Sequence, residues 1–169
     1  MTPLSHNKSK YFLDDEGYRP NVGIIVCNDT TQVLWARRTS RDGWQFPQGG
    51  MEPDESVEQA AYRELQEEVG LLPQHVRLIG RTQDWLRYDV PNKLLRRRDY
   101  GFCGQKQIWF LFHLIGSEED ICLDACEKPE FDDWRWVDYW DPLEQIVKFK
   151  RFVYEQALNE LKPFLSGIS

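Results

Sequence analysis

The chain has 169 residues and a mass of 20.1 kDa, with 41% hydrophobic residues, so it is long enough for one domain with a sizeable core and too short for two. Its seven Trp and seven Tyr exclude a disordered chain. The first ten residues hold no apolar run that could serve as a signal-peptide core. No later run approaches the roughly 20 apolar residues of a membrane span, so we expect a cytoplasmic protein without a membrane segment.

The net charge of −7 is unevenly distributed along the chain. Residues 118–133 contain eight acids against Lys128, a local balance of −7 that equals the total. The segment 93–106 carries a local +4, from Lys93, Arg96, Arg97, Arg98 and Lys106 against Asp99. A polyanionic substrate can therefore find a basic rim on an acidic protein.

The four cysteines, Cys27, Cys103, Cys122 and Cys126, form no CxxC pair. Without a secretory signal we expect them to be reduced packing residues. Cys122, Cys126 and His113 can be drawn as a zinc site, but their number and spacing fit such a site poorly.

In chain order, residues 1–15 are expected to form a flexible polar extension, and residues 16–169 a single domain. Residues 22–27 and 32–38 predict two strands of a hairpin with a turn at 28–31. The stretch 44–50, WQFPQGG, reads as a Pro/Gly loop whose backbone can approach a ligand closely.

The helix that follows this loop has clear ends. Ser56 and Gln59 have the spacing of a capping box, and Gly70 stands where a left-handed C-terminal residue is usual. The sequence therefore predicts a helix over residues 57–69.

One face of this helix starts apolar and ends acidic. Helical spacing places Val57, Ala60 and Ala61 in line with Glu64, Glu67 and Glu68, whereas Gln59, Arg63 and Gln66 take the solvent side. A solvated acidic face is the ordinary interpretation of a Glu-rich helix. Three partly covered carboxylates repel one another, however, and protons or a cation must relieve that repulsion. Because oxygen ligands favour Mg²⁺ or Mn²⁺ over zinc, we interpret the stripe as a site for such an ion.

The second half of the chain adds strands and a terminal helix. We expect a long or bent strand at 76–88, a basic loop at 91–104 and a strand at 105–115. An acidic loop at 116–129, with a short strand at 121–123, then leads to a strand at 130–136. Asp141 and Pro142 mark the start of a C-terminal helix, with an interruption left open around Lys148. Trp134, Trp136 and Trp140 are expected in the core, and the whole predicts an α+β fold with a mixed sheet between helices.

The loop and helix also resemble a known signature. Gly49, Glu55 and the run Arg63-Glu-Leu-Gln-Glu-Glu-Val-Gly-Leu71 match every defined position of the Nudix box, found in hydrolases of nucleoside diphosphates linked to another group. The flanking motifs GYRPNVG (17–23), WQFPQGG (44–50), DWLRYDVP (84–91), GQKQIWF (104–110) and PEFDDWRWV (129–137) are similar to those of the bacterial RNA pyrophosphohydrolases. This resemblance covers about residues 16–155. It implies a Nudix-type α/β/α sandwich.

The resemblance also implies a site and a reaction. Glu64, Glu67 and Glu68 with the carbonyl of Gly49 would hold Mg²⁺, with Mn²⁺ as a substitute, and Glu130 would complete the set. Either Glu64 or Glu130 would act as the general base. Arg63 is expected to orient the acids through an ion pair to Glu55 or Glu67. Candidate substrate contacts are Arg19, Arg38, Arg87 and Lys150 for phosphates and Tyr88 and Phe149 for a base.

Three functions remain open from the sequence. The first is an RNA 5′-pyrophosphohydrolase that leaves a 5′-monophosphate and initiates mRNA decay, and the second is a dinucleoside polyphosphate hydrolase. The third is a catalytically silent Nudix module that binds RNA or a protein, against which the intact acid set argues. We expect a monomer, and a protein activator is left open.

Overall fold

The computed structural model describes residues 13–39, 43–95 and 101–168. Within these residues, eight strands form one mixed sheet whose main path runs β3-β2-β1-β7-β5. Its centre is the parallel pair β1 (Tyr18–Cys27) and β7 (Gly104–Leu114), which are paired along ten residues of each strand. The other strands are β2 (Val33–Arg38), β3 (Trp44–Gln45), β4 (Gln48–Gly50), β5 (Val76–Arg81), β6 (Leu86–Asp89) and β8 (Phe131–Val137).

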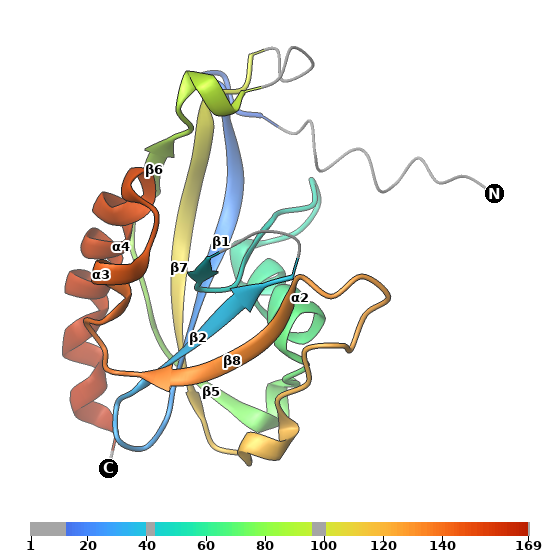
Figure 1. The fold of residues 1–169 in the computed structure, drawn as a ribbon, viewed down its shortest axis with the longest axis vertical. Helices are drawn as coiled ribbons and strands as arrows, with labels where there is room; N and C mark the ends of the chain where they lie inside the picture. Colours follow the sequence, from blue (N-terminus) through green and yellow to red (C-terminus); the bar gives the residue numbers. More distant parts are fainter. Residues whose placement is uncertain (1–12, 40–42, 96–100, 169) are drawn as a thin grey trace.

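Helices cover the sheet from two sides (Figure 1). The helix α2 (Val57–Val69) lies on one side, and α3 (Pro142–Gln145) and α4 (Lys148–Leu161) lie on the other. Short 3-10 turns connect these elements: η2 (Pro73–His75), η3 (Asn92–Leu94), η4 (Glu118–Asp120) and η5 (Lys162–Gly167). None of the helices in the described ranges is long and apolar enough to cross a membrane.

The alternation of side chains along the central strands builds two cores. Val22, Ile24 and Val26 of β1 join a buried cluster with Ala61 and Leu65 of α2. The alternate residues of β1 and β7 join a second cluster with α4, which includes Ile25, Cys27, Trp109, Leu111, Val153, Tyr154 and Leu158. Because successive strand residues point to opposite faces, one pair of strands supplies both cores.

The helix α2 has the predicted ends. The Ser56 side chain accepts from the backbone N–H of Gln59, and the Gln59 side chain accepts from the backbone N–H of Ser56. Gly70 ends the helix at φ 72°, and its N–H donates to the carbonyl of Gln66. The capping box and the left-handed C-terminal glycine are confirmed.

One loop prediction and one strand prediction are wrong because tertiary pairing overrides local sequence. The stretch 44–50 is not simply a loop, since Trp44–Gln45 pairs with β2 and Gln48–Gly50 pairs with β1. The predicted strand at 121–123 is absent, since the N–H of Cys122 instead donates to the carbonyl of Val69 at the end of α2.

The expected long strand at 76–88 is two strands, β5 and β6. The break begins at Thr82, whose buried hydroxyl accepts the N–H of Trp109 at 3.0 Å in place of a backbone carbonyl. The chain then leaves the sheet and returns at Leu86. The predicted helix start at 141 is also followed by an interruption, because α3 ends at Gln145 and α4 begins at Lys148.

The tryptophans do not all lie where the sequence suggests. Trp35 and Trp109 are fully buried, whereas Trp140, expected in the core, is 40% exposed. Trp134 and Trp136 are half-buried and form an edge-to-face pair on β8. The expected basic loop is described only in part, because Arg96, Arg97 and Arg98 lie outside the described residues, as do residues 1–12 of the predicted extension.

Candidate active site

Two consecutive glycines at the end of β4 allow opposite charges to approach the chain. A Cβ added at Gly49 would overlap the carboxyl group of Glu64, and one added at Gly50 would overlap the guanidinium of Arg19. Only residues without a side chain fit such close contacts. The Gly49–Gly50 backbone therefore lies between a carboxylate from α2 and a cation from β1.

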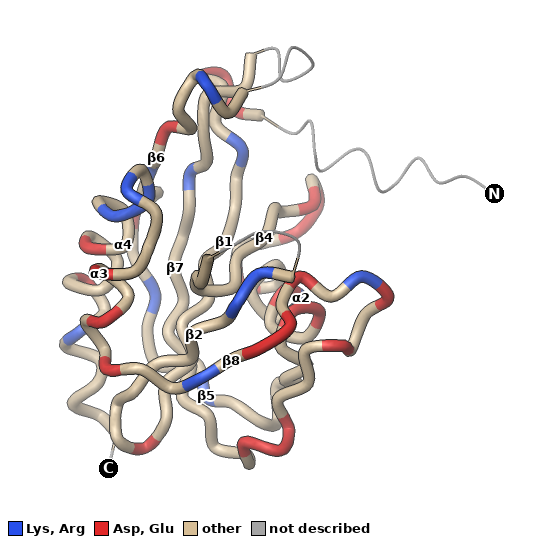
Figure 2. Tube along the Cα trace, in the orientation of Figure 1, with Lys and Arg blue, Asp and Glu red and all other residues tan. Residues whose placement is uncertain are grey.

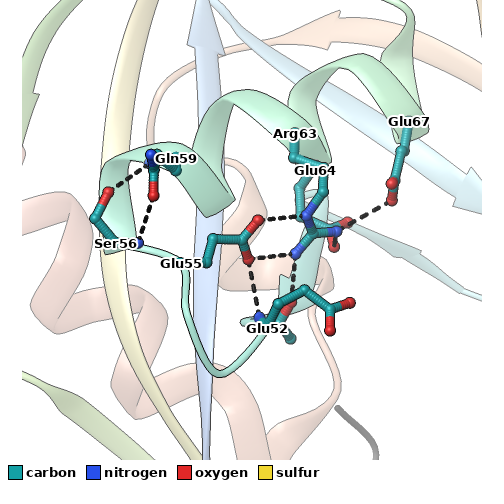
Figure 3. Close-up of polar contacts among 8 residues, drawn as sticks. Glu52, Glu55, Ser56, Gln59, Arg63, Glu64 and Glu67 are labelled. Atoms are coloured by element: carbon teal, nitrogen blue, oxygen red, sulfur yellow. Dashed lines mark hydrogen bonds and ion pairs between the residues drawn. The ribbon is translucent and has the colours of Figure 1, made fainter. Parts of the chain in front are cut away.

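Arg63 ties the loop to the helix (Figure 3). Its Nε and Nη2 donate to the two carboxylate oxygens of Glu55 at 2.7 and 2.8 Å, and Nη2 also donates to the carbonyl of Gly50 at 2.8 Å. Its Nη1 donates to Glu64 at 2.8 Å and to Glu67 at 3.3 Å. The expected ion pairs of Arg63 are present. The side chain is only 27% exposed, so it does not lie freely on the solvent side.

The three acids of the helix differ in their burial. The side chain of Glu64 is 8% exposed and Glu68 is half-buried, whereas the side chain of Glu67 is 50% exposed. The expectation that all three lean toward the covered half is therefore wrong for Glu67, which lies at the rim.

Burial and mutual repulsion raise the pKa values of the two covered acids. The pKa of Glu64 is raised to about 7, by burial first, with Arg63 opposing and Glu67 adding to the rise. The pKa of Glu68 is raised well above its usual 4.5, by burial and then by the carboxylates of Glu64 and Glu130. Glu130, which is distant from α2 in the sequence, is thus one of the charges that raise the pKa of Glu68.

The donor set fits a divalent cation. Glu68 Oε2 is buried and accepts no hydrogen bond from the described residues. A cation beside it would satisfy this oxygen and relieve the repulsion that raises both pKa values. No group of three or more His, Cys, Asp or Glu side chains in the described ranges already has the arrangement of a metal site, so the ligand set, including Gly49 and Glu67, stays a prediction.

Arg38, at the end of β2, links these acids to a pocket. Its Nε lies 3.9 Å from Glu130 Oε1, and the backbone of Glu130 accepts from the N–H of Thr39. The same arginine lines a pocket of about 310 Å³ together with Gly43, Trp44, Gln45, Leu94, Gln145, Ile146, Val147, Phe149 and Lys150. Arg38 thus belongs both to the surroundings of Glu130 and to this pocket of mixed polar and apolar residues.

Aromatic and cationic side chains meet at this pocket. The rings of Tyr88 and Phe149 lie 5.9 Å apart, and Lys150 Nζ lies 5.5 Å from the centre of the Tyr88 ring. Lys150 is itself buried and contacts Gln45 Oε1 at 3.4 Å. Burial raises the pKa of Tyr88 to about 12, so its phenol is protonated at neutral pH.

Arg19 of β1 is another cation close to the Gly49–Gly50 backbone. Burial lowers the pKa of its guanidinium, and the carboxylate of Glu64 partly offsets that shift. Its Nε is buried and donates to no hydrogen-bond acceptor among the described residues, and the same holds for Nε of Arg38. Both guanidinium groups thus have a buried Nε without a hydrogen bond, and Arg38 Nε keeps only its 3.9 Å ion pair with Glu130.

The structure does not bring Arg87 to this site. In β6 the buried residues Leu86 and Tyr88 alternate with the exposed residues Arg87 and Asp89. Arg87 instead lies over the ring of Tyr18 at 5.6 Å, and the hydroxyl of Tyr18 donates to Asp89. Because strand neighbours face opposite sides, Tyr88 packs against the pocket residues Phe149 and Lys150 while Arg87 points away from them.

Sequence reasoning missed the hydrogen-bonded polar residues that link β4 to β6, β7 and β1. Gln48 bridges Tyr88 and Gln107 at 3.3 Å each, and Gln107 donates to Asn21 at 2.9 Å. Trp44 and Gln45, which line the pocket, were also missed. The available signal was their place in the motif WQFPQGG, which ends in Gly49 and Gly50.

Charge is segregated across the molecule (Figure 2). Lys and Arg gather at the start of α4, while α2, β8 and the loop before β8 carry mainly Asp and Glu. The pocket lies on the basic side and the carboxylates on the acidic side, with Arg38 between them.

Comparison with known proteins identifies the family. A family model described as the NUDIX domain matches residues 17–157. The chain belongs to the Nudix family. Two curated relatives from Stenotrophomonas maltophilia, strains R551-3 and K279a, are 56% and 55% identical over 158 residues, which is 93% of this chain and 77% of each relative. Both relatives are called RNA pyrophosphohydrolase.

Solved structures of other Nudix proteins share the fold. Escherichia coli dihydroneopterin triphosphate pyrophosphohydrolase has a TM-score of 0.65 at 24% identity, covering 85% of this chain and 98% of its own. A Caenorhabditis elegans Ap4A hydrolase has a TM-score of 0.63 at 18% identity, covering 88% and 98%. The predicted α+β sandwich with a mixed sheet is confirmed.

Proposed function

We propose that this Nudix protein hydrolyses the 5′-triphosphate or 5′-diphosphate end of RNA and leaves a 5′-monophosphate. The observation that carries the proposal is the double contact of Arg38, which pairs with Glu130 and lines the pocket of Phe149 and Lys150. A phosphate chain bound at Arg38 would extend toward the carboxylates while the attached nucleotide occupies the pocket. The two relatives named RNA pyrophosphohydrolase support the same substrate class.

One group of residues binds the substrate, and another holds the metal ion that the reaction needs. Arg19, Arg38 and Lys150 bind phosphate oxygens, and Tyr88 and Phe149 enclose a base. Nudix hydrolases generally use divalent metal ions, and here Glu64, Glu67, Glu68, Glu130 and the Gly49 carbonyl would hold Mg²⁺. When bound, the ion supplies charge neutralisation and a more acidic water.

The proton of the attacking water needs an acceptor close to the phosphate chain. A carboxylate oxygen of Glu64 or of Glu130 can take it, since both belong to the cluster. Arg63 does not touch substrate, but it fixes Glu64 and the Gly50 carbonyl in place.

Labelled substrates test the proposal. The purified protein with Mg²⁺ is incubated with triphosphorylated RNA and, separately, with diadenosine tetraphosphate, and the products are separated. We expect 5′-monophosphate RNA, with pyrophosphate or orthophosphate reporting the bond cleaved, and the reaction should stop when EDTA removes the metal. If the hydrolysis rate with diadenosine tetraphosphate exceeds the rate with RNA by orders of magnitude, the protein is a dinucleoside polyphosphate hydrolase instead.

A monomeric state, a cytoplasmic location and a stimulating protein partner also stay predictions. Sedimentation of the purified chain checks the first, and the RNA assay with and without cell extract checks the last.

A further inference from the structure

The pocket has room for little more than one nucleotide of an RNA substrate. Its volume of about 310 Å³ is at the low end of the range for ligand pockets, roughly 300–1,000 Å³. An RNA longer than two nucleotides must therefore continue over the surface beside the pocket. The residues at the mouth of the pocket decide where it can continue.

Exposed apolar side chains gather at this mouth. Among the described residues, six large hydrophobic side chains are exposed, and Leu94 (53%) and Val147 (50%) are two that also line the pocket. A third, Phe152, is the most exposed of the six at 69%. Single exposed apolar residues are common on protein surfaces, but here two of them line one pocket and Phe152 lies on α4, the helix that also lines it.

Helix geometry places Phe152 next to the pocket. It follows Phe149, which lines the pocket, by three residues in α4, a rise of about 4.5 Å along the helix axis. Residues three apart lie on neighbouring positions of one helix face. Phe149 packs on Tyr88, whereas Phe152 presents most of its ring to solvent.

Two exposed cations lie close to Phe152 along the helix, and the exposed acid Glu155 follows it by three residues. Lys148 lies one turn before Phe152 and Arg151 directly before it, and both are exposed. The first turn of α4 contains no acidic residue, and its N-cap residue Val147 makes no side-chain cap bond. Arg151 has one ion pair, 3.8 Å to Glu144, between side chains that are 54% and 78% exposed. Such an exposed pair is weak enough to exchange for a phosphate.

We propose that Phe152, with Lys148 and Arg151, forms a stacking platform for an RNA nucleotide downstream of the one in the pocket. An exposed aromatic ring among cations is the arrangement that binds single-stranded nucleic acid without reading its sequence. The platform rests on the proposed function and deepens it, because an RNA chain has a downstream nucleotide to stack there and a dinucleoside polyphosphate does not.

A binding experiment tests the platform without catalysis. The probe is a 5′-monophosphate RNA of eight nucleotides with 2-aminopurine at position 3, 4 or 5, titrated with the full-length protein. Stacking should quench the fluorescence at one of these positions. Phe152→Ala should remove the quenching and weaken binding about tenfold. The matched control is Phe164→Ala, which truncates another exposed phenylalanine (39%), outside α4. Quenching that is equal in Phe152→Ala and wild type would overturn the platform.

Salt dependence tests the cations. Replacing Lys148 and Arg151 by Ala should lower the slope of log Kd against log salt by about 0.7 for each cation removed. An unchanged slope would contradict phosphate contacts at these two residues.

A hydrolysis experiment separates this inference from the proposed function. The ratio of kcat/KM for a triphosphorylated octanucleotide to that for a triphosphorylated dinucleotide should exceed one and should fall about tenfold in Phe152→Ala. If wild type hydrolyses neither RNA, the proposed function fails. If it hydrolyses both with the same ratio as Phe152→Ala, only the platform fails.

Discussion

Gly49 and Glu64 lie so close that a methyl group on the first would overlap the carboxyl group of the second. Replacing Gly49 by Ala should therefore displace Glu64 from its position beside Arg63 and reduce kcat at least 100-fold, at a stability cost of about 1–3 kcal/mol for overpacking. Steady-state assays and urea unfolding measure the two effects. Gly167→Ala is the control, because a Cβ there meets nothing within 4 Å. Equal activity of the two variants would show that the loop does not position Glu64.

Neutralising Glu68 should stabilise the metal-free protein while abolishing turnover. Because the pKa of Glu68 is higher in the folded chain than its usual 4.5, the folded state binds the proton more tightly, and stability falls as pH rises above 4.5. Glu68→Gln removes this penalty. In EDTA its melting temperature should exceed that of wild type at pH 8, with a difference that shrinks toward pH 4.

Added Mg²⁺ should reverse the order of the melting temperatures, so that wild type melts above Glu68→Gln. Wild type should gain melting temperature from the ion, and Glu68→Gln should gain much less. Glu58→Gln, on an exposed position of the same helix, should behave like wild type in both buffers and keep its activity. Equal stabilisation of all three proteins by Mg²⁺ would remove Glu68 from the ligand set.

Arg63→Lys should destabilise the loop and slow the reaction, because a single ammonium cannot reproduce the paired hydrogen bonds to Glu55. The Arg63 contact holds the pKa of Glu55 below its usual 4.5, so its stabilisation is present above that pH and is lost as pH falls through the folded-state value. We expect wild type to be more stable than the variant by about 1–3 kcal/mol at pH 7. Urea unfolding between pH 3 and pH 7 should show the two curves converging at the acid end, and a constant gap would contradict the assignment.

Arg38→Ala should raise KM for triphosphorylated RNA by about 10- to 100-fold, since one charged contact to phosphate is lost. Its neighbour provides the control, because Arg37 pairs with Asp132 on the exposed side of β2. Arg37→Ala should change KM less than about twofold, in keeping with the small energies of exposed pairs. The link between pocket and carboxylates would be refuted by equal effects of the two substitutions.

The local features of the site are predictable from sequence, because each depends on near neighbours in the chain. The capping box of Ser56 and the glycine end at Gly70 follow from spacing within a few residues. The ion pair of Arg63 with Glu67 follows from helical spacing, since the two residues are four apart in α2. The Nudix sandwich and the expected role of Glu130 as a metal ligand came from the family resemblance.

What could not be predicted depends on contacts between distant segments. Which of Arg87 and Tyr88 packs against Phe149 and Lys150 depends on the register of β6 against β7. The break at Thr82 depends on the N–H of Trp109, and the pairing of Gln48–Gly50 depends on β1. The burial of Lys150 likewise needs the ring of Tyr88, which lies on another strand.

The contact between Arg38 and Glu130 has a consequence for how ligands bind. Each side chain is now the counter-ion of the other, at 3.9 Å. If Glu130 binds a cation and Arg38 a phosphate, as proposed, a cation that engages Glu130 would release Arg38 toward phosphate, and a phosphate that engages Arg38 would release Glu130 toward the cation. By thermodynamic reciprocity, each ligand would then raise the affinity for the other by the same factor. Metal ion and substrate would be linked through one exchangeable ion pair, and the metal affinity measured without substrate would understate the affinity during turnover.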